Sequence, residues 1–196
     1  MAEKLRLFVS ATNDLEASRA VIGRVVADLP VQIGVEIRRT PAHGAAYDDI
    51  FELIANVDRV YFLLGRDITA PAGAEWHLAW QLERSILPLR AMVRRTPAAQ
   101  QFQRNYLGEW TTVRSNTDLA QLVTLDLVRI LNHPTNRYGL SVPDFELLTL
   151  HAARVRKQAP TIQGEPGGAE GGGVLLDTVH GDEFDDQFDD ELLVSN

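Results

Sequence analysis

Apolar and polar residues alternate along the chain with spacings that switch between the strand period and the helix period. Nearly continuous apolar runs at residues 5–10 and 59–64 are typical of buried strands in a parallel sheet. Between these runs, apolar residues recur every three or four positions, which predicts amphipathic helices. Strands that alternate with helices favour a doubly wound α/β fold.

The same periodicity gives expected bounds for each element. Strands are predicted at 5–10, 31–38, 59–64 and 86–93, with a short fifth strand at 110–114. Helices are predicted at 14–29, 47–54, 73–85, 98–107, 117–131 and 143–157. Thr12 or Asn13 is expected to cap the first helix, and Asn116 or Thr117 the helix that follows the fifth strand. The expected fold is a mostly parallel sheet of four to five strands, followed by a C-terminal helix and a disordered acidic tail.

Composition divides the chain into three parts. Residues 1–133 hold the expected α/β domain, 134–158 a helical extension, and 159–196 a glycine-rich linker and acidic tail. The chain contains no cysteine, which excludes disulfides, thiolate zinc sites and thiol catalysis. No apolar run is long enough to span a membrane and no signal peptide is recognised, so a cytoplasmic location without membrane contact is predicted.

Charge is distributed unevenly. All 19 basic residues precede residue 161, together with 17 of the 27 acidic ones, so the body carries about +2 and the tail −10. Within the tail, Phe184, Phe188 and Leu192 would share one face of a helix. Two interpretations stay open: a solubilising tail, or a segment at 174–194 that folds on a partner or back onto the body.

Glu75 is the leading candidate for chemistry. Ala79, Leu82 and Ile86 follow it at spacings that share one helical face, so its carboxylate is expected to point toward the sheet. The preceding strand ends shortly before, and open α/β sheets bind ligands at the carboxyl ends of their strands. The alternative is an ordinary acidic residue in a first helical turn, stabilised by the helix dipole.

Two loops at the same predicted edge supply further polar groups. Ser10, Thr12 and Asp14 follow the first strand and could contact a ribose or a phosphate, or simply cap the first helix. Arg66 and Asp67 follow the third strand and could bind an anion and a sugar hydroxyl, or pair with each other.

Other site classes lack support. The five histidines have no metal-ligand spacing, and no glycine-rich phosphate loop precedes a helix, so neither a metal nor a bound cofactor is predicted. The basic cluster Arg90, Arg94 and Arg95 is too small to predict nucleic-acid binding. Trp76 and Trp80 lie one turn apart, as expected for packing or for an interface.

Three segments together resemble a known group: LRLFVSATNDLEASRAVI, AGAEWHLAWQLERSILPL and FQRNYLGEWTTVRSNTDLAQLVTLDLVRIL. Their order and spacing are similar to a TIR-like family of unknown function, found at the N-termini of bacterial signalling and conflict proteins. The resemblance covers roughly residues 4–131, and Glu75 and Ala79 match the family's Glu-x-x-x-Ala helix. The family is related in fold to TIR domains and to nucleoside 2-deoxyribosyltransferases.

The resemblance implies cleavage of an N-glycosidic bond in NAD or another nucleotide. A carboxylate at the position of Glu75 would stabilise the oxocarbenium-like sugar that remains when the base departs, hold the ribose hydroxyls, or attack the sugar covalently. The residues implied to line the pocket are Ser10, Thr12, Asp14, Tyr47, Arg66 and Asp67. Two hypotheses follow: a nucleotide N-glycosidase of a bacterial defence or signalling system, and a non-catalytic module that assembles with itself or with a protein partner.

Overall fold

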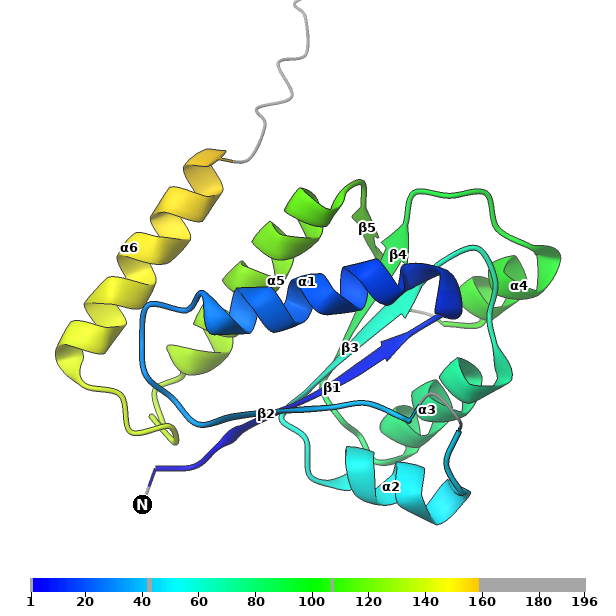
Figure 1. The fold of residues 1–196 in the computed structure, drawn as a ribbon, viewed down its shortest axis with the longest axis horizontal. Coiled ribbons are helices and arrows are strands. Elements are labelled where there is room, and N and C mark those ends of the chain that lie inside the picture. The colour runs from blue at the N-terminus through cyan, green and yellow to red at the C-terminus, as the bar shows by residue number, and fades with distance from the viewer. Residues whose placement is uncertain (1, 42–43, 107, 159–196) are drawn as a thin grey trace, which may run out of the picture. The chain divides into compact units, whose positions relative to one another are not determined.

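The computed structural model of the protein describes residues 2–41, 44–106 and 108–158. Five strands form one sheet in the order β2-β1-β3-β4-β5, and every neighbouring pair is parallel. Helices connect successive strands and cover the sheet (Figure 1). The predicted doubly wound α/β fold and its C-terminal helix are therefore confirmed.

The strands are β1 (Leu5–Ala11), β2 (Val35–Arg38), β3 (Arg59–Leu64), β4 (Ile86–Ala91) and β5 (Thr111–Val113). The helices are the 3-10 helix η1 (Asn13–Leu15), α1 (Glu16–Ala27), α2 (Tyr47–Ala55), α3 (Ala70–Gln81), α4 (Pro97–Asn105), α5 (Asn116–Leu131) and α6 (Val142–Gln158).

Alternate residues of each central strand pack into different cores. In β1, Leu7 and Val9 belong to the core beneath α1 and α5, whereas Phe8 packs with residues of α2 and α3. In β3, Tyr61 packs on the first side and Phe62 on the second. Both faces of the sheet are therefore covered, which accounts for the near-continuous apolar runs of these strands.

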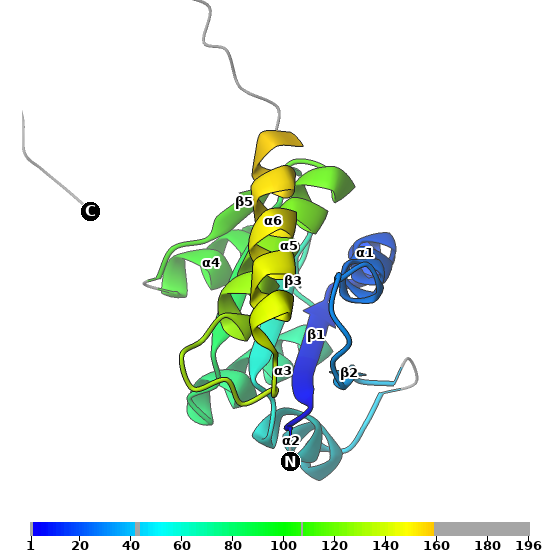
Figure 2. The same ribbon diagram turned by 90° about the vertical axis from the view of Figure 1, so that its left-hand side faces the viewer.

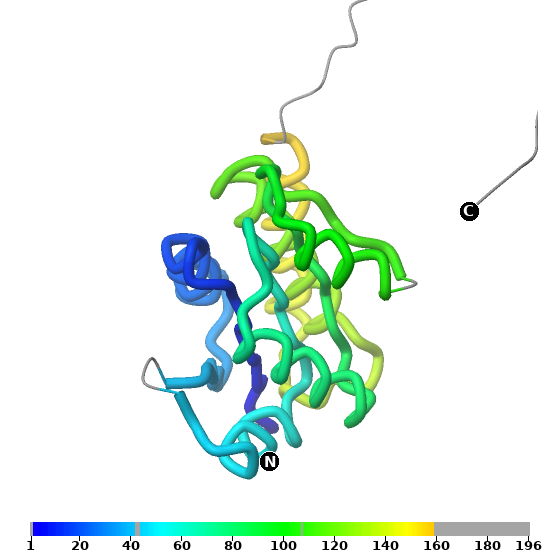
Figure 3. The backbone as a smooth tube through the Cα atoms, turned by 90° about the vertical axis from the view of Figure 1, so that its right-hand side faces the viewer, coloured from blue at the N-terminus to red at the C-terminus, as the bar shows by residue number. Residues whose placement is uncertain are grey.

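The strand order places a topological switch point between β1 and β3. From β1 the chain moves outward to β2, then returns to pair β3 on the other side of β1. Figure 3 is viewed from the side toward which the strands run, so the loops that follow β1 and β3 face the reader. Ligands of open α/β sheets bind in the crevice that such a switch creates.

Several predicted boundaries differ from the structure by two to four residues; α3, for example, ends at Gln81 rather than at residue 85, and β4 ends at Ala91 rather than at residue 93. Two of the differences have identifiable reasons. β2 begins at Val35 rather than at residue 31, because Val35 pairs with Leu5 and β1 extends no further. α3 begins at Ala70, with Pro71 in its first turn, where a missing amide donor costs nothing. Glu75 therefore lies in the second turn, and a first-turn dipole interaction does not account for it.

Neither of the two capping predictions is confirmed, because none of the predicted side chains caps its helix. Thr12 precedes η1 but forms no side-chain cap. Ser115, rather than Asn116 or Thr117, caps α5, because its hydroxyl accepts from the amide of Asp118 at 3.1 Å.

An aromatic cluster fills the space between β3, α3 and α4. Trp76 stacks on Trp110 with ring centroids 5.5 Å apart, and both contact Phe62 edge-on. Trp80, one turn after Trp76, is 58% exposed. Of the two tryptophans in α3, one therefore packs in the core and the other lies on the surface.

The chain divides into two units at Pro160, and the described residues belong to the first. The predicted linker and tail at 159–196, including the 174–194 segment, lie outside the described residues. Among the described helices, none combines the length and apolarity needed to cross a membrane.

Candidate functional site

Glu75 points into the protein at the carboxyl end of β1. Its side chain is 5% exposed, and it shares the buried face of α3 with Ala72, Leu78 and Ala79. The hydroxyl of Ser10, near the end of β1, donates a short hydrogen bond to Glu75 Oε2. The inward orientation expected from the spacing is thus observed, and Ser10 is its direct partner.

Burial controls the electrostatics of this carboxyl group. Loss of solvent raises the pKa of Glu75 above its ordinary value, because the charged form is disfavoured in a dry environment. The Ser10 hydroxyl, the nearby Thr40 hydroxyl and the positive charge of Arg19 act in the opposite direction without cancelling the effect. A perturbed carboxyl group at the ligand-binding edge of a sheet is a characteristic of functional sites.

Two side chains near Glu75 carry buried polar atoms without a clear hydrogen-bond partner. Among the described residues, the buried Nε of Arg19 and the buried Oγ1 of Thr40 have no hydrogen-bond partner. Arg19 is held in place by its Nη2, which donates to the carbonyl of Ala11 at 3.0 Å. The Thr40 hydroxyl lies close enough to the Glu75 carboxyl group to lower its pKa, so the Arg19 Nε is the clearer unsatisfied donor at this site.

The loops at the switch point bind each other directly. Thr12 Oγ1 accepts from the amide of Gly65 at 3.0 Å and donates to Asp14 Oδ1 at 2.6 Å. Asp14 Oδ2 in turn accepts from the amide of Arg66 at 2.7 Å. Thr12 and Asp14 thus join the end of β1 to the end of β3 and shape the crevice.

Gly65 makes this junction sterically feasible. A Cβ atom at this position would lie 2.1 Å from Asp14 Oδ2, far closer than any real contact. Glycine is required here by the close approach of a carboxylate, because its backbone leaves the space that a side chain would occupy.

The remaining sequence candidates have different surroundings. The Asp67 carboxylate accepts from its neighbour's amide and from the Thr96 hydroxyl, so it braces the loop that leads to α4. Arg66 is exposed, and within the described residues its guanidinium has no hydrogen bond or ion pair. Tyr47 is 58% exposed at the start of α2 and is not brought into contact with Glu75 by any described hydrogen bond.

A cavity of about 510 Å³ lies beside the segment that approaches Glu75. Pro41 lines this cavity, and the preceding residue, Thr40, is the one whose hydroxyl lies near the Glu75 carboxyl group. The volume falls within the range of small-molecule sites. Glu75 does not line the cavity itself.

Three residues of the candidate site were not predicted from the sequence. Arg19 and Thr40 carry no local signal, because only the packing of α1 and of the segment after β2 brings them to Glu75. Gly65 was detectable, since a glycine directly after a buried strand often marks a close approach of two chain segments.

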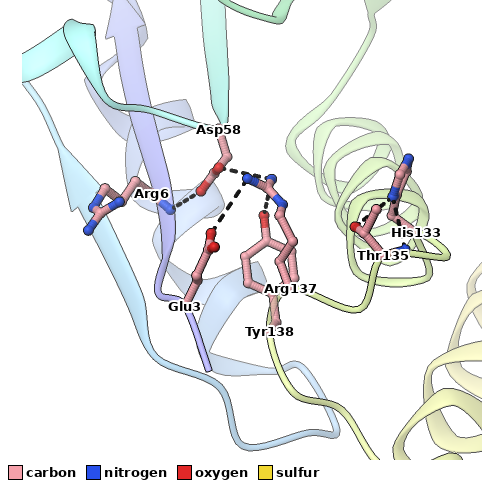
Figure 4. A network of polar contacts seen from close by, with 7 residues as sticks. All are labelled: Glu3, Arg6, Asp58, His133, Thr135, Arg137 and Tyr138. Carbon is pink, nitrogen blue, oxygen red and sulfur yellow. Dashed lines mark hydrogen bonds and ion pairs between the residues drawn. The ribbon is translucent and has the colours of Figure 1, made fainter. Parts of the chain in front are cut away.

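A second polar network lies at the opposite, amino edge of the sheet (Figure 4). Arg137 donates to Asp58 Oδ1 and to the Tyr138 hydroxyl, each at 3.0 Å, and its guanidinium lies 3.6 Å from the Glu3 carboxylate. Asp58 Oδ2 accepts from the amide of Arg6 at 2.8 Å. These charges satisfy each other, so the network fastens the segment after α5 to the sheet.

Comparison of the chain with protein families, with curated proteins and with solved structures gives no significant match. The class of the protein is therefore defined by its architecture alone. It is a parallel, five-stranded, doubly wound α/β protein, with a topology compatible with the TIR-like and flavodoxin-like groups.

Proposed function

We propose that the protein is a TIR-like N-glycosidase that cleaves NAD or a related nucleotide, in a bacterial defence or signalling system. The observation that carries the proposal is the buried Glu75 carboxylate, which Ser10 holds at the carboxyl edge of the sheet beside the switch point. This is the edge at which doubly wound folds bind nucleotides.

The chemistry follows from the surroundings of Glu75. When the base leaves, positive charge develops on the ribose, and a carboxylate in a dry site stabilises that charge more strongly than one in water. Ser10 keeps the carboxyl group oriented, and the unpaired Nε of Arg19 suits a ribose hydroxyl or a phosphate oxygen. The exposed guanidinium of Arg66 suits a phosphate at the rim.

Substrate entry requires a movement in this proposal. Glu75 is almost fully buried and does not line the neighbouring cavity, which segment 40–41 borders through Pro41. Displacement of this segment would join the cavity to the carboxylate. Closure of such a segment over bound substrate would exclude bulk water and leave room for the one water molecule that must attack the ribosyl carbon and give up its proton as the base leaves.

The test is release of nicotinamide from NAD by the purified full chain, followed by chromatography over a range of protein concentrations. Glu75→Gln preserves the size of the side chain and removes its charge, so release should fall to background. Glu83→Gln is the matched control, because Glu83 is exposed just after α3; it should leave the rate unchanged. Equal release by wild type and Glu75→Gln would remove Glu75 from the mechanism.

A second candidate function is a non-catalytic assembly module, and the burial of Glu75 favours it. In that case the Ser10–Glu75 pair is enclosed in every state of the protein. Absence of turnover with NAD and with other nucleotides, in dilute and in concentrated protein, would favour the module.

A further inference from the structure

α6 carries an apolar surface that no other described element covers. It packs on α5 through Leu148 and Ala152, which are buried. Figure 2 shows α6 in front of α5, with its outer side facing the viewer. On the exposed side, Val142 is 71% and Leu150 55% exposed, and they line an apolar hollow of about 450 Å³ with Phe145 and Thr149. Apolar side chains thus gather around one hollow on a helix face that no other described element covers.

The charges along this surface determine which partner fits. Val142, Glu146, Leu150 and Arg154 follow each other at intervals of four residues, so they form one row along the helix. Glu146 and Arg154 carry opposite charges, lie equally far from Leu150, and are both exposed. Neither has an ion pair among the described residues.

We propose that the outer face of α6 binds the same face of a second copy of this chain, in an antiparallel pair with its twofold axis at Leu150. Such an axis places Leu150 against its own counterpart. It also places Glu146 of each copy beside Arg154 of the other, so two equivalent ion pairs form across the interface. A parallel pair would bring like charges together, and a symmetric interface is the commonest way in which identical chains associate.

Thr149 and Ala153, adjacent to the row, are small enough to allow close approach of the helices. One helix face buries less than a standard interface, so the dimer should be weak, with a dissociation constant of roughly 1–100 µM.

The experiment measures the mass of the full chain in solution by analytical ultracentrifugation over a concentration series. Wild type should shift from monomer to dimer across that range. Glu146→Arg and Arg154→Glu should each weaken the dimer by about tenfold or more, because both symmetric ion pairs become repulsions. Met92→Glu is the control, since Met92 is 73% exposed in the turn after β4 and should leave the dimer unchanged.

Recovery of the dimer by complementary charge changes distinguishes the antiparallel arrangement from a general loss of association. The two single variants mixed in equal amounts should recover dimers, since every pair is again oppositely charged, and so should the double variant Glu146→Arg/Arg154→Glu. Both recoveries should weaken as salt is raised. A wild type that stays monomeric, single variants that dimerise like wild type, or failure of both rescues would each overturn the proposal. A dimer that persists in every variant would mean that another surface forms it.

Discussion

Replacement of Glu75 by Gln should make the protein more stable at neutral pH. In wild type, burial raises the pKa of Glu75 above 4.5, so ionisation of this side chain weakens the folded state. Gln has nearly the same shape and can still accept the hydrogen bond from Ser10, but it carries no charge to bury.

The size of the effect follows from two opposing contributions. An ionised carboxylate loses several kcal/mol of hydration on burial, and one charge-assisted hydrogen bond returns about 1.5–3 kcal/mol of this. Because Gln keeps a neutral bond of about 0.5–1.5 kcal/mol, Glu75→Gln should raise the free energy of unfolding by about 1–3 kcal/mol. For a chain of this size, each kcal/mol corresponds to a rise in Tm of about 2–4 °C.

The dependence on pH gives the gain a specific signature. A raised pKa in the folded state means that the neutral form contributes stability fully below the ordinary value of 4.5, and that this is lost as the pH rises through the folded-state pKa. The advantage of Glu75→Gln should therefore be small below pH 4.5 and grow above it, until wild type is fully ionised.

Urea unfolding followed by tryptophan fluorescence measures this difference, since Trp76 and Trp110 report on the core. Exposed Glu83→Gln should show no such pH dependence. A stability difference that is constant with pH, or a less stable Glu75→Gln at neutral pH, would refute the argument that burial of the charge dominates at this site.

Three further changes test neighbouring parts of the structure. Ser10→Ala should cost about 1–3 kcal/mol at neutral pH, because Glu75 loses its donor, and a double-mutant cycle with Glu75→Gln should show that the cost depends on the charge. Asp126→Ala should cost about 3–5 kcal/mol in urea unfolding, since it leaves the largely buried Arg59 without its bidentate partner. Gly65→Ala should lower stability by more than 1 kcal/mol, roughly, through its clash with Asp14, and any nicotinamide release should fall with it.

The sheet and its helices could be predicted because their signals are local. The apolar run of β3 and the spacing of α5 reflect burial that each element needs, whichever neighbours provide it. The start of β2 could not be predicted in this way. Val31 is buried like a strand residue, yet it has no partner in the sheet because β1 begins too late to pair with it.

The site was predictable only in part, for the same physical reason. The inward direction of Glu75 depends only on its own helix, so the spacing of apolar residues in the sequence predicts it. The roles of Thr12 and Asp14 depend on the approach of Gly65 and Arg66 from a distant segment, which converts expected ligand contacts into a junction between two loops. Tyr47, which the resemblance implies to line the pocket, and Phe51 are both substantially exposed on α2.

The buried polar side chains of the described chain fall into two kinds: those that satisfy a main-chain group and those that do not. They are Ser10, Thr12, Glu75 and Thr124. Thr12 accepts from a backbone amide and Thr124 donates to a backbone carbonyl, so each satisfies a main-chain group. The bond of Ser10 and Glu75 satisfies only those two side chains, so an alanine and an apolar residue would fill the same space without a buried charge. The fold does not need this pair, and its position at the switch point is the reason to test it for chemistry.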